Sequence, residues 1–218
     1  MLKYLFIIII IHCRFLVPAQ MQVRDEPRHH NVFENEFLRI LDVYLPPKDT
    51  TLYHLHNTPS VFIILANTNV SSQLMGKQPQ KGANVAGVVS YDSLATPRLH
   101  RVWNDDTSWF HVMDIELTGT KQKSNIAMLK DPSLKLLFNE QQVNGYNIDL
   151  KPGNILDLPA SANGYLIVSQ TESFIDYKIN GITQHRILKP AHYIWVEAGR
   201  TFSLKGNNAA NFVLLQLK

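Results

Sequence analysis

Three histidines have the types and spacing that a metal site requires. His54 and His56 lie in the segment Tyr53-His54-Leu55-His56, and His100 begins His100-Arg101-Val102-Trp103-Asn104. Side chains alternate faces along a β-strand, so His54 and His56 are expected on one side of a strand. A third imidazole brought to that side would complete a facial triad, which suits zinc, iron, copper or nickel. The alternative is strand histidines whose rings bond backbone carbonyls or water.

The surrounding segments predict a β scaffold. Residues 37–45 are rich in β formers, residues 61–65 form a continuous apolar run, and residues 109–117 carry one mostly apolar face. Asn180-Gly181 between two isoleucines is a strong two-residue hairpin signal. About a dozen short strands of this kind predict an all-β sandwich or barrel.

One helix is expected between two β units. Asp131 suits an N-cap, Pro132 suits the first helical position, and Leu134, Leu137 and Phe138 form a helical stripe. Residues 119–143 are therefore predicted to be a linker that carries a helix.

Composition places the chain among ordinary globular proteins. Of 218 residues, 45% are hydrophobic and 18% charged, and the formal net charge is +3. No basic patch predicts binding to nucleic acid or to an anionic membrane surface. The sequence contains no GxSxG motif, no phosphate-binding glycine loop and no CxxC pair, so serine hydrolase, nucleotide-binding and zinc-ribbon functions have no support.

The N-terminus has the layout of a secretory signal peptide. Lys3 precedes an apolar run over residues 4–11, and Val17-Pro18-Ala19 ends in a small residue. Residues 1–20 are therefore predicted to be removed, which gives a secreted or periplasmic protein with no membrane attachment after cleavage. An uncleaved anchor is the alternative, but the apolar run is short for a membrane span. Cys13 is the only cysteine, so the mature chain would have neither disulfides nor thiol chemistry, and lipidation of Cys13 is a minor alternative.

These motifs resemble those of the cupin superfamily over nearly the whole mature chain. His54-Leu55-His56 resembles the H-x-H of the first cupin motif, and His100 with Asn104 resembles the H-x3-N of the second. The resemblance implies a double-stranded β-helix (jelly-roll) barrel that holds a divalent metal ion (Fe, Zn, Ni, Cu or Mn) through His54, His56 and His100. Ser60 and Val61 occupy the positions where the family carries a metal-binding glutamate. The remaining set of three histidines resembles the thiol dioxygenase branch, and its neutral ligands would favour an anionic substrate.

The second half resembles a degenerate cupin repeat, so the resemblance implies a bicupin. Residues 148–154 resemble the turn before the first motif, Ala160 and Ala162 fall near the positions of its two histidines, and Phe202 takes the place of the third. The expected domains are an N-terminal barrel over residues 32–118, the linker over residues 119–143, and a C-terminal barrel over residues 144–218 without metal ligands.

The leading functional hypothesis is an exported bicupin with metal in its first barrel. If it is an enzyme, the resemblance implies dioxygenase chemistry on a small organic acid, thiol or phenol, with lyase or isomerase chemistry second. The rival hypothesis is a non-catalytic protein that binds a small ligand such as a sugar, or has a structural role. Cupins often pair by strand exchange, so a homodimer is expected unless the two barrels satisfy that interface within one chain.

Five other positions carry weaker expectations. His111 is predicted to be a core-edge histidine, with a ligand or acid–base role in the barrel as the alternative. Asn104 is expected to hold a turn. Arg39 is expected at the surface or in an ion pair, with binding of a substrate carboxylate as the alternative. The pair His29-His30 is expected to be solvated in a polar spacer.

Overall fold

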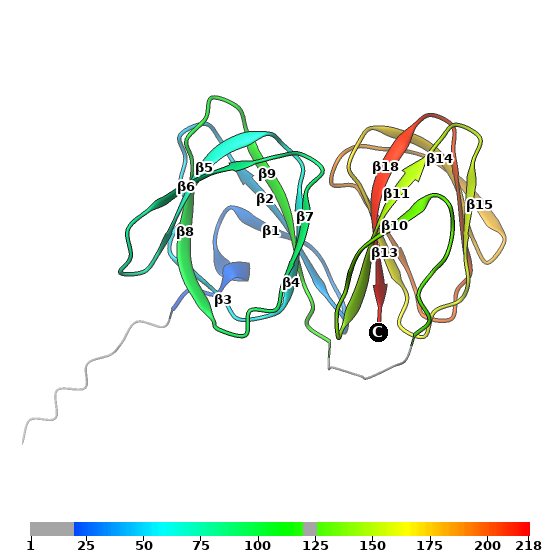
Figure 1. Ribbon diagram of the computed structural model, residues 1–218, viewed down its shortest axis with the longest axis horizontal. Coiled ribbons are helices and arrows are strands. Elements are labelled where there is room, and N and C mark those ends of the chain that lie inside the picture. Colours follow the sequence, from blue (N-terminus) through cyan, green and yellow to red (C-terminus); the bar gives the residue numbers. More distant parts are fainter. Residues whose placement is uncertain (1–19, 120–125) are drawn as a thin grey trace, which may run out of the picture.

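Two β-barrels lie side by side in the structure (Figure 1). The computed structural model describes residues 20–119 and 126–218. The predicted signal peptide lies outside the described residues, apart from Gln20. Within the described ranges the only helix is the short 3-10 helix η1 (Val23–Asp25), and none is long and apolar enough to cross a membrane.

The first barrel is built from strands β1 to β9. Their bounds are β1 (His29–Glu34), β2 (Arg39–Leu45), β3 (His54–His56), β4 (Ser60–Ile64), β5 (Thr68–Leu74), β6 (Gln80–Asn84), β7 (Val89–Asp92), β8 (Arg98–Asn104) and β9 (Phe110–Glu116). They form one sheet in the order β1-β2-β9-β4-β7 and a second in the order β3-β8-β5-β6.

The second barrel is built from strands β10 to β18. Their bounds are β10 (Leu134–Asn139), β11 (Val143–Leu150), β12 (Ile155–Leu158), β13 (Tyr165–Ser169), β14 (Ser173–Ile179), β15 (Ile182–Leu188), β16 (Tyr193–Val196), β17 (Phe202–Gly206) and β18 (Ala210–Leu217). The sheet orders are β10-β11-β18-β13-β16 and β12-β17-β14-β15. Strand by strand, these repeat the orders of the first barrel, and the all-β fold class is confirmed.

The predicted linker helix is wrong, because its residues form strand β10. Leu134 to Asn139 pair antiparallel with β11. The Asp131 side chain accepts hydrogen bonds from the backbone N–H and the hydroxyl of Ser133, which makes a turn into the strand where a helix N-cap was expected. Phe138 also packs over Gly145, where a Cβ would lie 2.2 Å from the phenyl ring. Pairing across the sheet therefore overrides the local helical pattern.

The predicted hairpin at Asn180-Gly181 is confirmed. Ile179 pairs with Ile182 directly across the turn, and β14 and β15 continue from them in register. Asn180 and Gly181 have φ angles of 49° and 81°, the left-handed values that a tight type I′ turn requires.

Apolar residues form three clusters with different roles. One cluster fills the second barrel, and a second lies between the barrels, where Ile40 and Met113 of the first meet Leu166 and Val213 of the second. The third lies inside the first barrel, on the inward faces of β2 and β9. That interior also contains polar groups, and it is the part of the fold that positions the candidate site.

Arg39 lies in a buried ion-pair group at one end of the first barrel. Its Nη1 donates to Glu116 at 2.6 Å and its Nη2 to Glu34 at 2.6 Å. The Glu116 side chain is only 3% exposed, while that of Glu34 is 45% exposed. The hydrogen bonds from Arg39 lower the pKa of Glu34 to about 2. The ion-paired role expected for Arg39 is therefore confirmed, in a buried position.

Removing Arg39 should destabilise the fold strongly. We expect Arg39→Met to lower the free energy of unfolding by about 3–5 kcal/mol, because Glu116 is left as an uncompensated buried charge. Chemical denaturation monitored by circular dichroism measures this change. Arg39→Met/Glu116→Leu should recover most of the loss, and Glu34→Gln should cost about 1 kcal/mol or less because Glu34 is exposed. An Arg39→Met protein as stable as the parent would contradict this account.

Candidate metal centre

The pairing of β3 with β8 brings the three sequence-predicted histidines together. His54 lies directly opposite His100 in the antiparallel ladder, and His56 lies opposite Arg98. The ring centroids of His54 and His100 are 4.7 Å apart, those of His56 and His100 are 4.9 Å apart, and those of His54 and His56 are 5.0 Å apart. His54 and His56 are both buried, as expected for side chains two residues apart on an inward strand face.

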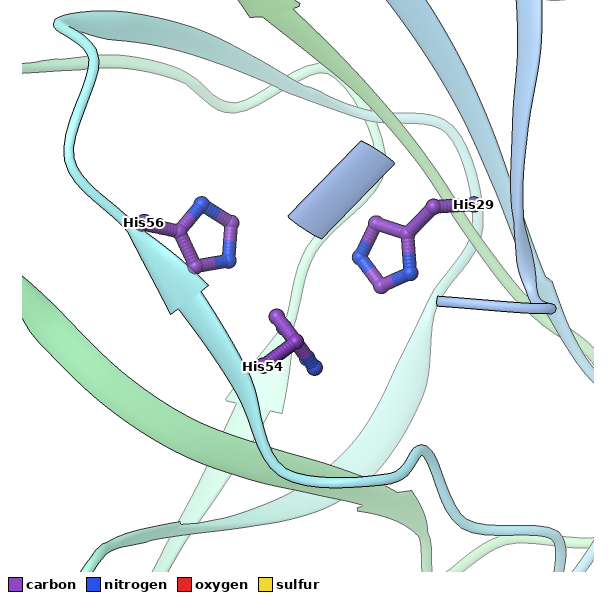
Figure 2. A group of neighbouring side chains, drawn as sticks. All are labelled: His29, His54 and His56. Atoms are coloured by element: carbon purple, nitrogen blue, oxygen red, sulfur yellow. The ribbon is translucent and has the colours of Figure 1, made fainter. Parts of the chain in front are cut away.

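A fourth histidine, His29, joins this cluster. The expectation that it is solvated is wrong, because His29 is 8% exposed and its ring centroid lies 4.7 Å from that of His54. Ligand nitrogens of His29, His54 and His56 all lie within 4.8 Å of one another, a group that could hold a metal ion. Figure 2 shows the three rings gathered around a common space. His30, the next residue, is exposed as predicted.

Two of the imidazoles are fixed by acceptors on their outer side. The Nδ1 of His29 bonds the Glu26 carboxylate at 2.7 Å, and the Nδ1 of His54 bonds the Leu52 carbonyl at 2.8 Å. Both partners are acceptors, so each Nδ1 carries the proton and each Nε2 keeps its lone pair when the ring is neutral. Metal-binding histidines in proteins are commonly oriented in this way.

Glu26 is itself held in place from several sides. Its side chain is fully buried and accepts hydrogen bonds from the backbone N–H groups of Arg28 and Leu52. Burial acts to raise the pKa of Glu26, but the hydrogen bonds from His29, Arg28 and Leu52 together hold that pKa below its usual value. Glu26 therefore remains ionised and can fix the His29 ring.

A second buried carboxyl group lies beside His56. The Oδ2 of Asp114 is 3.5 Å from the Nδ1 of His56, and neither atom has a hydrogen-bond partner among the described residues. Burial, and then the charge of Glu116, raise the pKa of Asp114 to about 8. Asp114 faces the Nδ1 of His56 as Glu26 faces that of His29, so both rings have a carboxyl group at this nitrogen.

Burial also keeps three of the imidazoles neutral. It lowers the pKa of His54 to about 4 and that of His100 to about 3, and it brings the pKa of His56 far below its usual value. Neighbouring imidazoles and Arg98 add to the effect at His56 and His100. Neutral imidazole is the form that binds metal ions. At neutral pH these rings therefore need not release a proton before they bind a metal ion.

The histidine cluster opens into a cavity of about 570 Å³ inside the first barrel. Its walls are mainly apolar, from residues such as Val43, Leu45, Phe62, Ile64, Val70 and Val102. Its polar lining includes the four histidines, Arg98 and Asp114. A largely apolar cavity with a few convergent polar groups is the usual form of a small-molecule site.

An unpaired nitrogen argues that the donor set fits a metal ion. The Nε2 of His100 is buried without a hydrogen-bond partner among the described residues. Buried polar atoms are rarely left unpaired unless a water, ion or ligand satisfies them. Neutral nitrogen donors suit zinc, copper, iron and nickel better than magnesium or calcium.

His111 and Asn104 lie outside this ligand group. The Nε2 of His111 bonds Asp42 at 2.8 Å, and its ring stacks on Tyr44. These residues are on the faces of β2 and β9 that turn away from the cavity, so His111 is a core-edge residue, as predicted. The Asn104 side chain donates to the carbonyls of Leu45, Pro46 and Ser108 and so holds a turn, also as predicted.

The second barrel has no comparable cluster at the matching strands. Strands β12 and β17 pair as β3 and β8 do, and the buried side chains there are Leu156 and Leu158, opposite Leu204 and Phe202. The placement of Ala160 and Ala162 at the histidine positions is wrong, because both follow β12 and are exposed. The placement of Phe202 at the third histidine is wrong too, because Phe202 lies opposite Leu158 as Arg98 lies opposite His56, and Leu204 takes the position of His100. These positions hold apolar packing where the first barrel has imidazoles.

His29 and Asp114 were missed by sequence reasoning for different reasons. His29 precedes the recognised motif, and its place in the cluster depends on a hairpin. The chain turns at Asn35 so that strand β1 pairs with β2, which places His29 opposite Val43. Asp114 lies on the face of residues 109–117 opposite the one whose apolar pattern predicted the strand. Phe110 and Val112 share the face of Asp114 and line the cavity.

Solved structures show that this architecture is the cupin fold. The chain is similar to YhaK from Escherichia coli, with a TM-score of 0.58 and 13% identity over 86% of this chain and 90% of that one. It is also similar to a salicylate 1,2-dioxygenase from Pseudoaminobacter salicylatoxidans with gentisate adducts. The TM-score is 0.59, with 11% identity over 92% of this chain and 75% of that one. A cupin 2 conserved barrel domain protein from Leptotrichia buccalis gives a TM-score of 0.57, with 11% identity over 87% of this chain and 88% of that one. No family model and no curated protein matches the sequence.

Glu26 should matter for metal affinity although it is not a ligand. We expect Glu26→Gln to weaken binding of Co²⁺ or Zn²⁺ to the histidine cluster by about 10–100-fold, the usual effect of losing an outer partner of a ligand. The glutamine side chain of the variant has an NH₂ group in place of one carboxylate oxygen. This group would face one of the N–H donors of Arg28, His29 or Leu52 that the carboxylate accepts from in the parent. Competition titration with a chromophoric chelator gives the dissociation constants.

Asp49→Asn provides the matched control for this experiment. The Asp49 carboxylate accepts hydrogen bonds from the Nε and Nη2 of Arg28, and Asp49 makes no hydrogen bond to a histidine. Its substitution should leave metal affinity unchanged. Equal affinity in the parent and in a folded Glu26→Gln protein would show that Glu26 does not orient His29.

Proposed function

We propose that the first barrel binds one divalent metal ion through His29, His54, His56 and His100, and uses it to oxidise a small organic molecule. The observation that carries the proposal is the convergence of four largely buried imidazoles, two of which, His29 and His54, already have an acceptor at the outer nitrogen. Such an arrangement stabilises an ion and costs free energy without one. The set enlarges the three-histidine site that the sequence predicts by adding His29.

The protein's own residues would prepare the site for the ion. Glu26 and the Leu52 carbonyl hold His29 and His54 with Nε2 free, and Asp114 can accept from the Nδ1 of His56. When bound, iron or copper would supply activation of dioxygen, whereas zinc would supply only Lewis-acid polarisation. The apolar cavity walls would limit water around a bound substrate.

Oxidation is proposed ahead of lyase or isomerase chemistry because of the fold comparison and the donor set. One structural neighbour is a dioxygenase, and its structure contains gentisate adducts. A set of neutral ligands also leaves the full charge of a ferrous ion to attract substrate. The second barrel, with its packed apolar interior, is proposed to be a structural repeat, which makes the protein a bicupin. We further propose export from the cytoplasm, on the basis of residues 1–20.

Metal content is the experiment that tests this function. We expect untagged protein starting at Gln20, purified and reconstituted anaerobically with ferrous ion, to hold about one metal ion per chain by elemental mass spectrometry. His54→Ala/His56→Ala should hold almost none. His29→Ala should bind more weakly than the parent, since it removes one of the converging nitrogens. An oxygen electrode then reports dioxygen uptake with small organic acids, thiols and phenols.

Control variants separate ligation from simple destabilisation. His111→Ala removes a histidine of the same barrel that lies outside the cluster, so it should keep the metal. No metal in a folded parent after reconstitution would contradict the metal proposal and favour the rival, a non-catalytic ligand-binding or structural protein. Full metal occupancy without dioxygen uptake for any of these substrate classes would contradict the oxidative step alone.

A further inference from the structure

The cavity of the first barrel is lined by an arginine, Arg98, whose hydrogen-bond donors are only partly paired. Arg98 is the only arginine or lysine among the described residues that line the cavity. Its Nη1 donates to Asp92 at 2.8 Å. Its Nε is buried and has no hydrogen-bond partner, and among the described residues Nη2 makes no hydrogen bond either. One edge of the guanidinium is therefore free.

This free edge has the shape of a carboxylate site. Nε and Nη2 present two parallel N–H groups, and a carboxylate accepts such a pair through its two oxygens. Asp92 occupies the other side of the guanidinium, and its second oxygen accepts from the backbone N–H of Leu94. Asp92 therefore holds Arg98 in position and leaves the Nε–Nη2 edge to a ligand.

Arg98 also lies at the right place beside the candidate metal centre. It is the cross-strand partner of His56, on the same pair of strands that brings His54 and His100 together. The Phe62 ring lies near both groups, with its centroid 5.8 Å from Arg98 Cζ and 6.0 Å from the centroid of the His56 ring. A ligand bound to Arg98 would thus have an aromatic wall for its apolar part and imidazoles at its far end.

The charge of the metal-loaded cavity favours an anion. The imidazoles are neutral donors and contribute no negative charge, and Asp92 offsets the positive charge of Arg98. Asp114 is the other carboxyl group in the lining, while the Glu26 carboxylate lies behind His29 and pairs with Arg28. Even full ionisation of Asp114 would offset only part of the charge of a divalent ion, and an anionic ligand would compensate the remainder.

We propose that the cavity takes a small monocarboxylate, bound through the Nε and Nη2 of Arg98, with its apolar part against Phe62. The use of this ligand as a substrate rests on the proposed function, whereas the contact with Arg98 does not require the metal. The competing view is that Arg98 serves only to tie β8 to β7 through Asp92. The two views predict opposite results when the guanidinium is changed.

Benzoate and its neutral analogue benzamide are suitable probes. Isothermal titration of each into metal-loaded and metal-free protein measures binding to the cavity. Benzoate should bind the parent more tightly than benzamide in both forms. Arg98→Met should weaken benzoate binding by about tenfold or more, since a charge-assisted bidentate contact is lost, and should leave benzamide binding unchanged.

Two further variants make the test specific. Arg101→Met changes an arginine of the same strand that bonds Gln73 and does not line the cavity, so benzoate affinity should stay at the parent value. Asp92→Asn removes the negative charge that offsets Arg98 but keeps an oxygen that can accept from Leu94. It should tighten benzoate binding several-fold, which a merely structural ion pair would not do. Circular dichroism establishes that each variant is folded, and Arg98→Gln replaces Arg98→Met if the latter is not.

The outcomes separate this inference from the proposed function. Equal benzoate affinity in the parent and a folded Arg98 variant, or equal affinity of the parent for benzoate and benzamide, would overturn it. A parent that holds its metal and binds no benzoate would also overturn it, and the metal proposal would stand. Benzoate binding that depends on Arg98 in metal-free protein would support the inference even if the metal proposal failed.

Discussion

The first barrel buries four imidazole rings inside an apolar shell, and the rest of its interior is constrained by the need to pair their nitrogens. Buried polar atoms must be paired, and the cost of leaving them unpaired grows as the surroundings become drier. Glu26 and the Leu52 carbonyl satisfy the outer nitrogens of His29 and His54, and Asp114 faces that of His56. Ligand nitrogens of His29, His54 and His56 lie within 4.8 Å of one another, and the three rings surround a common space (Figure 2). Because neutral imidazoles are poor partners for each other at such positions, a cation is the simplest group that would satisfy them together.

The two barrels solve the same topological problem with different interiors. Both have the same strand order, but the second fills its interior with packed apolar residues such as Leu156, Leu158 and Phe202. The first keeps an open cavity lined by polar groups. Apolar residues of both barrels pack between them, so the filled barrel supports the sheet β1-β2-β9-β4-β7 from behind. That sheet supplies His29 and Asp114 to the site, which gives the second barrel a positioning role without ligands of its own.

Local sequence patterns predicted the parts of the site that depend on strand periodicity. His54 and His56 share a face because they are two residues apart, and the resemblance to cupin motifs placed His100 beside them. His29 could not be found in this way, because its place depends on a hairpin that pairs β1 with β2. The helix predicted around Leu134 failed for a related reason: its apolar spacing also suits a strand, and pairing with β11 decides the outcome. Where long-range pairing sets the structure, a local pattern in one sequence is insufficient.

The ligand shell of the metal-loaded protein provides the most direct test of the central claim. X-ray absorption spectroscopy of the protein reconstituted with a divalent ion distinguishes imidazole nitrogen from carboxylate oxygen and counts the imidazole rings by their multiple scattering. We expect a shell with four imidazoles, reduced by one ring in His29→Ala, and no carboxylate of Glu26 or Asp114 bound directly. A shell dominated by oxygen, or one that is unchanged in His29→Ala, would contradict it.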